Sequence, residues 1–180
     1  RPAVFGMCHE LAYIFYLTDG WEHIHITGTE TLGAILDILI FPRYFPYARM
    51  VNETDASAAH SFLLGRSKAP ALQNAHAVLR VQPEFVEAAP RTSSHLVPGR
   101  QHIMNDAGSR GYDDVLAGWL GALGMRIQFV QLTAEHHRVA SLVLSAMLRA
   151  GPSETAFYDP RDEVLRYASV FDSPSLPVAA

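Results

Sequence analysis

The chain has 180 residues, of which 49% are hydrophobic and 18% charged, with a net charge of −4 and one cysteine, Cys8. This composition is typical of one water-soluble globular domain, and it excludes a disordered chain and a disulfide scaffold. No apolar run approaches the roughly 20 residues of a membrane-spanning helix, and no secretory signal opens the sequence, so we expect a cytoplasmic protein without a membrane partner. The scattered basic residues also argue against a nucleic-acid partner.

Short apolar runs alternate with segments of helical period, which favours an α/β fold with a mostly parallel sheet. In the first half, residues 35–41 are almost continuously apolar, and this pattern predicts a central strand that is buried on both faces. The expected elements of this half are a strand at 3–5 with a turn at Gly6, a helix at 9–18, strands at 24–27 and 35–41, a helix at 54–60 and a strand at 61–64.

The clearest helix of the second half begins after Thr133, which is a suitable N-cap, and runs to about Ala150 before Gly151-Pro152. A second helix is predicted over residues 112–123 by an apolar stripe that Gly124 closes. The other expected elements are strands at 77–81, 101–104 and 126–132, a loop at 84–99 and a short helix at 160–171.

Five segments taken together resemble a known family. They are the strand and turn at 4–11, the Asp-apolar-Pro segment at 36–42, Arg-Ser-Lys at 66–68, Val-Gln-Pro-Glu-Phe at 81–85, and the stretch from Leu-Gly-Met to Glu-His-His within 123–137. In order and spacing the chain resembles the nucleotide-binding domain of prephenate dehydrogenases, which oxidatively decarboxylate prephenate.

The resemblance implies a Rossmann-like domain over residues 1–132, with helices on both faces of a mostly parallel sheet. Residues 133–180 would then be a helical extension, the remnant of the family's dimerisation domain. Since residues 133–171 could offer an apolar helical face, a homodimer is a further expectation.

The cofactor of the family is expected to be absent. Its glycine fingerprint falls on Gly6, Cys8 and Leu11, so only the turn glycine is kept. Glu10 would compete with a phosphate at the helix N-terminus, and Gly28 replaces the acidic residue that binds the ribose. We therefore expect no cofactor, with NAD or NADP as the alternative.

The catalytic histidine of the family falls on Gln82, which forms hydrogen bonds but does not take up a proton near neutral pH. The serine of its Ser-x-Lys turn falls on Arg66 or Ser67, and His136 takes a position at the mouth of the cleft. The expected catalytic residues are Glu10, His9, Gln82 and His136, and the expected substrate-binding residues are Gly6, Cys8, Ser67 and Tyr44.

Two of these groups have simpler interpretations. Cys8, His9 and Glu10 either gather a nucleophile, a base and an acid at one turn, or are a buried cysteine beside a solvated pair. His23 and His25 share one face of their expected strand, but no third ligand is visible nearby, so we expect a structural role and no metal site.

Three functions follow. The first is a repurposed relative of the family that acts as a cofactor-independent lyase, isomerase or cyclase on a small organic substrate, in secondary metabolite biosynthesis for example. The second is a divergent NAD(P)-dependent dehydrogenase of prephenate or arogenate type. The third is a non-catalytic binding protein.

Overall fold

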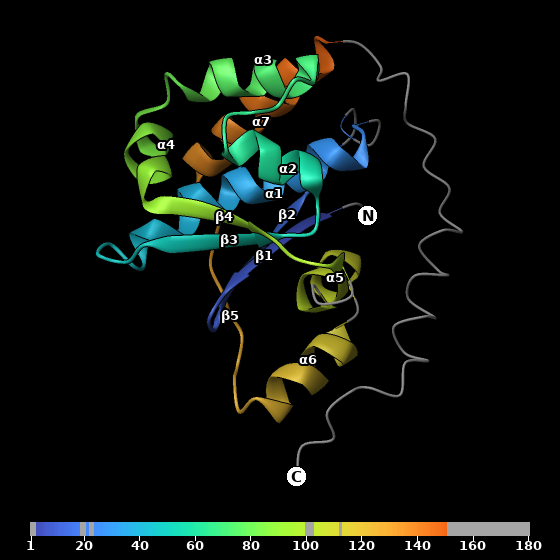
Figure 1. The fold of residues 1–180 in the computed structure, drawn as a ribbon. Helices are drawn as coiled ribbons and strands as arrows, with labels where there is room; N and C mark the ends of the chain where they lie inside the picture. The colour runs from blue at the N-terminus through green and yellow to red at the C-terminus, as the bar shows by residue number, and fades with distance from the viewer. Residues whose placement is uncertain (1–2, 19–20, 22–23, 100–102, 112, 151–180) are drawn as a thin grey trace.

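The computed structural model describes residues 3–18, 21, 24–99, 103–111 and 113–150 (Figure 1). They form a mixed α/β fold, as expected, although the strands make two small sheets. None of the helices in these ranges is long and apolar enough to cross a membrane. In chain order the elements are β1 (Ala3–Cys8), β2 (Leu11–Tyr16), α1 (Ile26–Ile40), η1 (Phe41–Arg43), β3 (Met50–Thr54), α2 (Ser57–Leu63), α3 (Pro70–Leu79), α4 (Pro83–Ala88), η2 (Ala89–Arg91), β4 (Thr92–Leu96), α5 (Ile103–Arg110), α6 (Asp113–Ala122), β5 (Gln128–Phe129) and α7 (Ala134–Leu148).

The first sheet is built on a hairpin. β1 and β2 pair antiparallel over their whole length, from Ala3 opposite Tyr16 to Cys8 opposite Leu11. The turn lies at His9 and Glu10, and His9 has a positive φ of 53°. β5 adds a short parallel pair to the outer side of β2. The helix expected at residues 9–18 and the turn expected at Gly6 were therefore wrong, because the aromatic and β-branched residues from Tyr13 to Tyr16 favour a strand.

Helix α1 is the centre of the molecule. Ten of its residues, from Gly28 to Ile40, are buried, because the hairpin covers one side and other helices cover the rest. The strand expected at 35–41 was wrong for this reason, since periodicity alone cannot separate a buried strand from a helix that is apolar all round. The strand expected at 24–27 was wrong as well, because Ile26 and Thr27 begin the helix. His25 begins the helix, because its Nδ1 accepts a hydrogen bond from the backbone N–H of Thr27 at 3.2 Å.

The second sheet consists of β3 and β4, which pair parallel from Met50 opposite Thr92 to Thr54 opposite Leu96. Helices α2, α3 and α4 form the connection between them. The strands expected at 61–64 and 77–81 belong to α2 and α3, and the loop expected at 84–99 contains α4 and β4. Pro83 at the first turn of α4 suits a helix start, while the polar sequence of β4 carried no apolar alternation.

Helix α7 packs against α3 and α1 and shares their core. Its predicted start at Thr133 is confirmed: the Thr133 side chain accepts from the backbone N–H of His136 at 3.3 Å, and His136 Nδ1 accepts from that of Thr133 at 3.1 Å. This reciprocal pair is a capping box.

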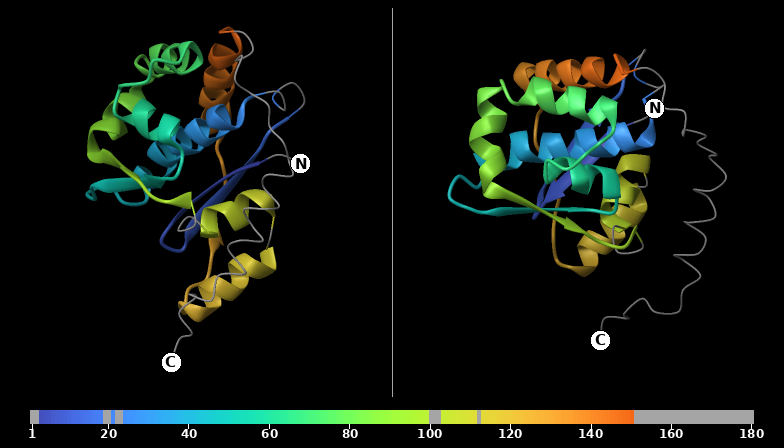
Figure 2. Two further views of the ribbon diagram at one scale, coloured as in Figure 1. Left: turned by 45° about the vertical axis from the view of Figure 1, so that its right-hand side comes forward. Right: turned by 45° about the horizontal axis from the view of Figure 1, so that its top comes forward.

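Helices α5 and α6 lie on the opposite side of the hairpin from α1 (Figure 2). α6 confirms the predicted helix at 112–123, apart from Tyr112, which lies outside the described residues. The strand expected at 101–104 was wrong at Ile103 and Met104, which begin α5. The strand expected at 126–132 is reduced to Gln128 and Phe129, and the expected helix at 160–171 lies outside the described residues.

Candidate functional site

Strands β1 and β3 each have one partner among the described strands, so each is an edge of its sheet. Both lie against α1. Along β1, Val4 is opposite Gly33 and Gly6 is opposite Asp37, so the strand runs in the direction of the helix. Asn52 in β3 bonds Asp37, and Ala56, just after β3, packs with Ala34. β3 therefore runs in the direction opposite to α1. The two edges are consequently antiparallel to each other.

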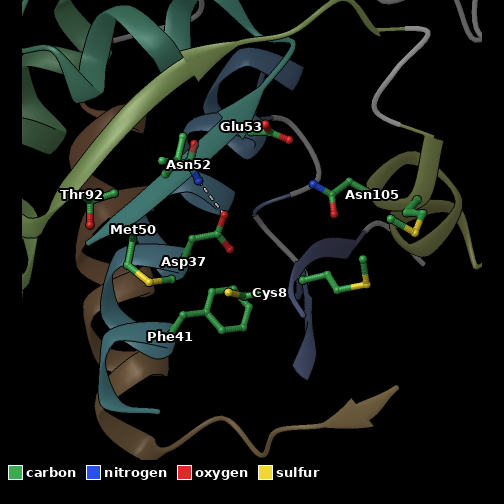
Figure 3. Close-up of a pocket in the computed structure, with 11 residues that line it drawn as sticks. Cys8, Asp37, Phe41, Met50, Asn52, Glu53, Thr92 and Asn105 are labelled. Carbon is green, nitrogen blue, oxygen red and sulfur yellow. Dashed lines mark hydrogen bonds between the residues drawn. The ribbon is translucent and has the colours of Figure 1, made fainter. Parts of the chain in front are cut away.

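A cavity of about 210 Å³ lies between these two edges (Figure 3). This volume is below the roughly 300–1,000 Å³ of pockets that enclose small organic ligands. The cavity is bordered by β1 and β3, and contributions also come from α1, β4 and α5. We call it the slot; its lining residues are Met7, Cys8, Asp37, Phe41, Met50, Val51, Asn52, Glu53, Thr92, Met104 and Asn105.

A polar cluster forms the α1 side of the slot. Asn52, 7% exposed, donates through Nδ2 to Oδ2 of Asp37 at 2.7 Å. The hydroxyl of Tyr13 lies 2.9 Å from Oδ1 of Asp37 and 3.0 Å from the carbonyl oxygen of Gly33, so one proton serves two acceptors. Burial, followed by the charge of Asp37, raises the pKa of Tyr13 well above its ordinary value, and the phenol stays a donor.

One atom of this cluster lacks a partner in the described part of the chain. Oδ1 of Asn52 is buried and accepts no hydrogen bond there. A buried carbonyl oxygen without a donor costs about 1–3 kcal/mol relative to one that is paired. Because Asn52 lines the slot, a ligand in the slot could supply that donor.

The slot has two faces because side chains alternate along a strand. Val4 and Gly6 of β1 point toward α1, and Cys8 shares their face. Phe5 points toward α5, where it lies against Gly108, and Met7 shares that face. Any extended chain in the slot would therefore present alternate side chains to the polar cluster and to the side of Met7 and α5.

Burial and then the negative charge of Asp37 raise the pKa of the Cys8 thiol. The thiol is therefore largely protonated at neutral pH and is a weak nucleophile there. Cys8 is partly buried at the border of the slot.

The other residues of the predicted site are spread over several elements. His9 and Glu10 form the turn of the hairpin, and both are exposed. The His9 ring lies 5.5 Å from that of Phe45, and Glu10 Oε1 accepts from the backbone N–H of Arg126 at 3.4 Å. These contacts connect the hairpin tip to the segments after α1 and before β5.

Gln82 and His136 lie instead at the N-termini of α4 and α7. Arg138 joins these helices, because its Nη2 donates to Oε1 of Gln82 at 2.7 Å and its guanidinium also binds Glu135. His136 is used as a cap, and burial followed by the charge of Arg43 lowers its pKa. The structure thus brings Gln82 close to the first turns of α7. His9 and Glu10 lie instead at the turn of the β1–β2 hairpin.

The expected substrate-binding residues are divided as well. Cys8 borders the slot, while Gly6 lies inside β1 beneath Asp37 and Tyr13. Ser67 lines a second cavity of about 200 Å³ beside Phe62 and His76. Tyr44 follows α1 and is 49% exposed.

The two histidines considered for a metal do not form a described strand. His25 caps α1, and His23 lies outside the described residues. Within the described ranges no three His, Cys, Asp or Glu side chains come together as metal ligands.

Sequence reasoning missed the polar cluster on the α1 side of the slot, in which Asn52 and Tyr13 bond Asp37. A signal was present in Asp37 itself, a single carboxylate in the apolar stretch 35–41. A buried acid of this kind requires polar partners, but their identity depends on the packing of β3 on α1.

No protein-family model, no curated protein and no solved structure matches this chain.

Proposed function

We propose that the chain is a polypeptide-binding module that accepts an extended segment of another polypeptide in the slot between β1 and β3. The observation that carries the proposal is the pair of sheet edges on one helix, separated by a cavity. Each edge presents backbone N–H and C=O groups, and the addition of a strand would satisfy both rows at once. Since the edges are antiparallel to each other, the added strand would be antiparallel to one edge and parallel to the other.

The dimensions also favour an extended chain over an enclosed metabolite. The slot is smaller than most ligand pockets, and it lies between two strands of opposite direction. Neighbouring strands of a sheet lie about 4.8 Å apart, and we propose that one added strand would join the two small sheets. Glu53, an exposed acidic residue that borders the slot, gives the segment a negative charge to complement.

The test uses a seven-residue peptide of alternating valine and threonine with lysine at its centre, acetylated and amidated at its ends. We expect saturable binding, together with slower hydrogen exchange at amides of residues 3–8 and 50–54. The matched control is the same peptide with an N-methyl group on every residue, which cannot donate to either strand edge and should not bind. Equal binding of the two peptides would contradict the proposal.

The chain without peptide provides a second check. The amides on the free sides of β1 and β3 should exchange rapidly. If they are already protected, a segment of the same chain or a second copy fills the slot, and the proposed role for another polypeptide is wrong. Light scattering on the same sample distinguishes these two occupants.

The second candidate is the non-redox enzyme of Rossmann-like type that the resemblance implies, acting on a small organic substrate. It is favoured by one observation, that Cys8 and the Asp37 carboxylate border the same cavity. Prephenate should then raise the melting temperature and be consumed without NAD or NADP. Consumption only with NAD or NADP would instead favour the dehydrogenase, and no response to any of these compounds would contradict both enzymes for prephenate as the substrate.

A further inference from the structure

One buried acceptor in the slot restricts which extended segment it would take. We propose that the strand that enters the slot carries a short hydroxyl side chain, with threonine as the reference case, at the position opposite Asn52, and that this hydroxyl donates a hydrogen bond to Oδ1 of Asn52. This inference rests on the proposed function and adds the side chain that would be recognised.

The bond to Asp37 fixes the orientation of the Asn52 amide. An ionised carboxylate only accepts hydrogen bonds, so the nitrogen of the amide must face it, and Nδ2 donates to Oδ2 of Asp37 at 2.7 Å. The oxygen of the same amide, Oδ1, is buried and accepts no hydrogen bond within the described part of the chain. Asn52 is 7% exposed and lines the slot. A group that enters the slot can therefore supply the donor that Oδ1 lacks there.

The pleat of β3 determines which residue of an added strand would meet Asn52. Asn52 and Thr54 are buried, whereas Val51 and Glu53 are exposed, so alternate residues of β3 face the interior. Residues opposite each other on neighbouring strands point to the same face, and their Cβ atoms lie about 4.5–5.5 Å apart in an antiparallel pair. The residue opposite Asn52 would thus point toward α1, with its side chain in reach of Oδ1. Its two neighbours would share the outer face with Val51 and Glu53.

A hydroxyl matches a single open acceptor better than the other polar side chains do. Threonine and serine have one side-chain hydrogen to donate, whereas a side-chain amide has two and a lysine ammonium group has three. Each further hydrogen that is buried without an acceptor opposes binding. A carboxylate has no hydrogen to donate and would leave Oδ1 unpaired. The slot volume of about 210 Å³ also favours a short side chain, because the backbone of the added strand must occupy part of the same space.

The experiment compares two peptides that differ by one hydroxyl group. Each has two lysines at either end for solubility, and between them five residues, the length of β3. These five are valine, except that the central one is threonine or valine; both are β-branched and favour strands. We expect the threonine peptide to bind about fivefold more tightly, which is the size of the net contribution of one hydrogen bond.

The sign of this difference shows whether the hydroxyl finds its acceptor. A hydroxyl that is buried without a partner loses its hydrogen bonds to water and binds less favourably than a methyl group. The threonine peptide should therefore bind more tightly only where an acceptor is present. In Asn52→Ala, which lacks Oδ1, the valine peptide should bind at least as tightly as the threonine peptide.

Asn52→Ala also removes the bond to Asp37, so its matched control must lose stability without a change in the slot. Thr133→Ala removes the side-chain cap of α7, and the loss of a cap costs about as much as the loss of a hydrogen bond. The slot is lined from β1, β3, β4, α1 and α5, so Thr133→Ala should keep the preference for threonine. Circular dichroism at the temperature of the binding measurement shows whether each variant is folded.

If Asn52→Ala is not folded, a third peptide decides on the unaltered chain. O-methylthreonine at the centre keeps the side-chain oxygen but has no hydrogen to donate. It should bind no more tightly than valine, and an affinity equal to that of threonine would overturn the inference.

The outcomes distinguish the inference from the function on which it rests. Equal affinity of the threonine and valine peptides, with slower hydrogen exchange at the β1 and β3 amides, would keep the strand-binding function and overturn the hydroxyl. A preference for threonine that persists in Asn52→Ala, or that is lost in Thr133→Ala, would overturn the assignment to Asn52. No binding of either peptide would overturn both the inference and the function.

Discussion

The Asn52 side-chain amide donates to the Asp37 carboxylate at 2.7 Å, and this hydrogen bond joins the second sheet to the central helix. Asn52 is on β3 and Asp37 is on α1, so the bond fixes the position of β3, one border of the slot, relative to α1. The Tyr13 hydroxyl meets the same carboxylate from β2. The Asp37 side chain therefore joins α1 to β2 and β3, and its loss should be felt in both sheets.

Asn52→Ala should lower the free energy of unfolding by about 1–3 kcal/mol, since the substitution removes a buried donor and leaves Asp37 with fewer partners. Urea unfolding followed by circular dichroism measures the change. Glu53→Gln is the matched control, because Glu53 is the next residue and is exposed, and it should change stability by less than about 0.5 kcal/mol. Equal effects of the two substitutions would contradict a structural role for the Asn52–Asp37 bond.

Gly6→Ala should be strongly destabilising. A Cβ atom at Gly6 would overlap Oδ1 of Asp37 and would lie 2.6 Å from Cζ of Tyr13, which is fully buried. Overpacking of this kind costs about 1–3 kcal/mol or more. The matched control is Gly118→Ala in α6, where a Cβ meets nothing within 4 Å; it should stabilise the chain by about 0.5–1 kcal/mol, because alanine favours a helix interior over glycine.

The thiol of Cys8 should react slowly with iodoacetamide at pH 8, because burial and Asp37 raise its pKa in the folded chain. Asp37→Asn removes the negative charge, lowers the Cys8 pKa and should speed alkylation several-fold. Both chains should react at the same rate in 8 M urea, where Asp37 no longer faces the thiol. A rate in the folded chain that does not change on substitution would show that the charge of Asp37 has no influence on Cys8.

The raised pKa of Cys8 also predicts how the stability of the chain depends on pH. A thiol with a raised pKa when folded binds its proton more tightly in the folded state, so it contributes stability below the unfolded pKa of about 8.5. That contribution is lost as the pH rises above this value. Between pH 8 and 10 the free energy of unfolding should therefore fall less steeply in Cys8→Ala than in the unaltered chain.

Mild acid should weaken the start of α7. Since His136 Nδ1 accepts the Thr133 N–H, protonation of the ring breaks the cap. The pKa of His136 is lowered in the folded chain, so the unfolded state takes up the proton first and stability falls as the pH drops below about 6.5. His136→Gln keeps the reciprocal cap without a titrating group, and its stability should change less between pH 7 and 5, which thermal unfolding would measure.

The parts of the fold that sequence reasoning predicted are those with local signals. The start of α7 was predicted because Thr133 is a suitable N-cap, and α6 was predicted from its apolar stripe. α1 was missed because it is buried nearly all round, and its sequence lacks the polar face that would identify a helix. A segment of this type satisfies the pattern of a central strand equally well.

The candidate site was harder to predict because none of its contacts is local. Cys8 was included because the glycine fingerprint of the resemblance falls on it, but Asp37 and Asn52 were not included, since the bond between them depends on the packing of β3 against α1. The predicted site at 4–11 assumed a strand, a turn and a helix. The hairpin moved His9 and Glu10 to an exposed tip and left Gly6 in the interior.

The parallel pairing of β3 with β4 also has a consequence for the order of folding. The hairpin closes through a two-residue turn at His9 and Glu10, so β1 and β2 can form early from neighbours in the chain. β4 can reach β3 only after the chain has passed through three helices, and the entropy of closing this loop is lost before any of its hydrogen bonds form. The second sheet is thus expected to form late, on a surface that α1 and the hairpin have already built.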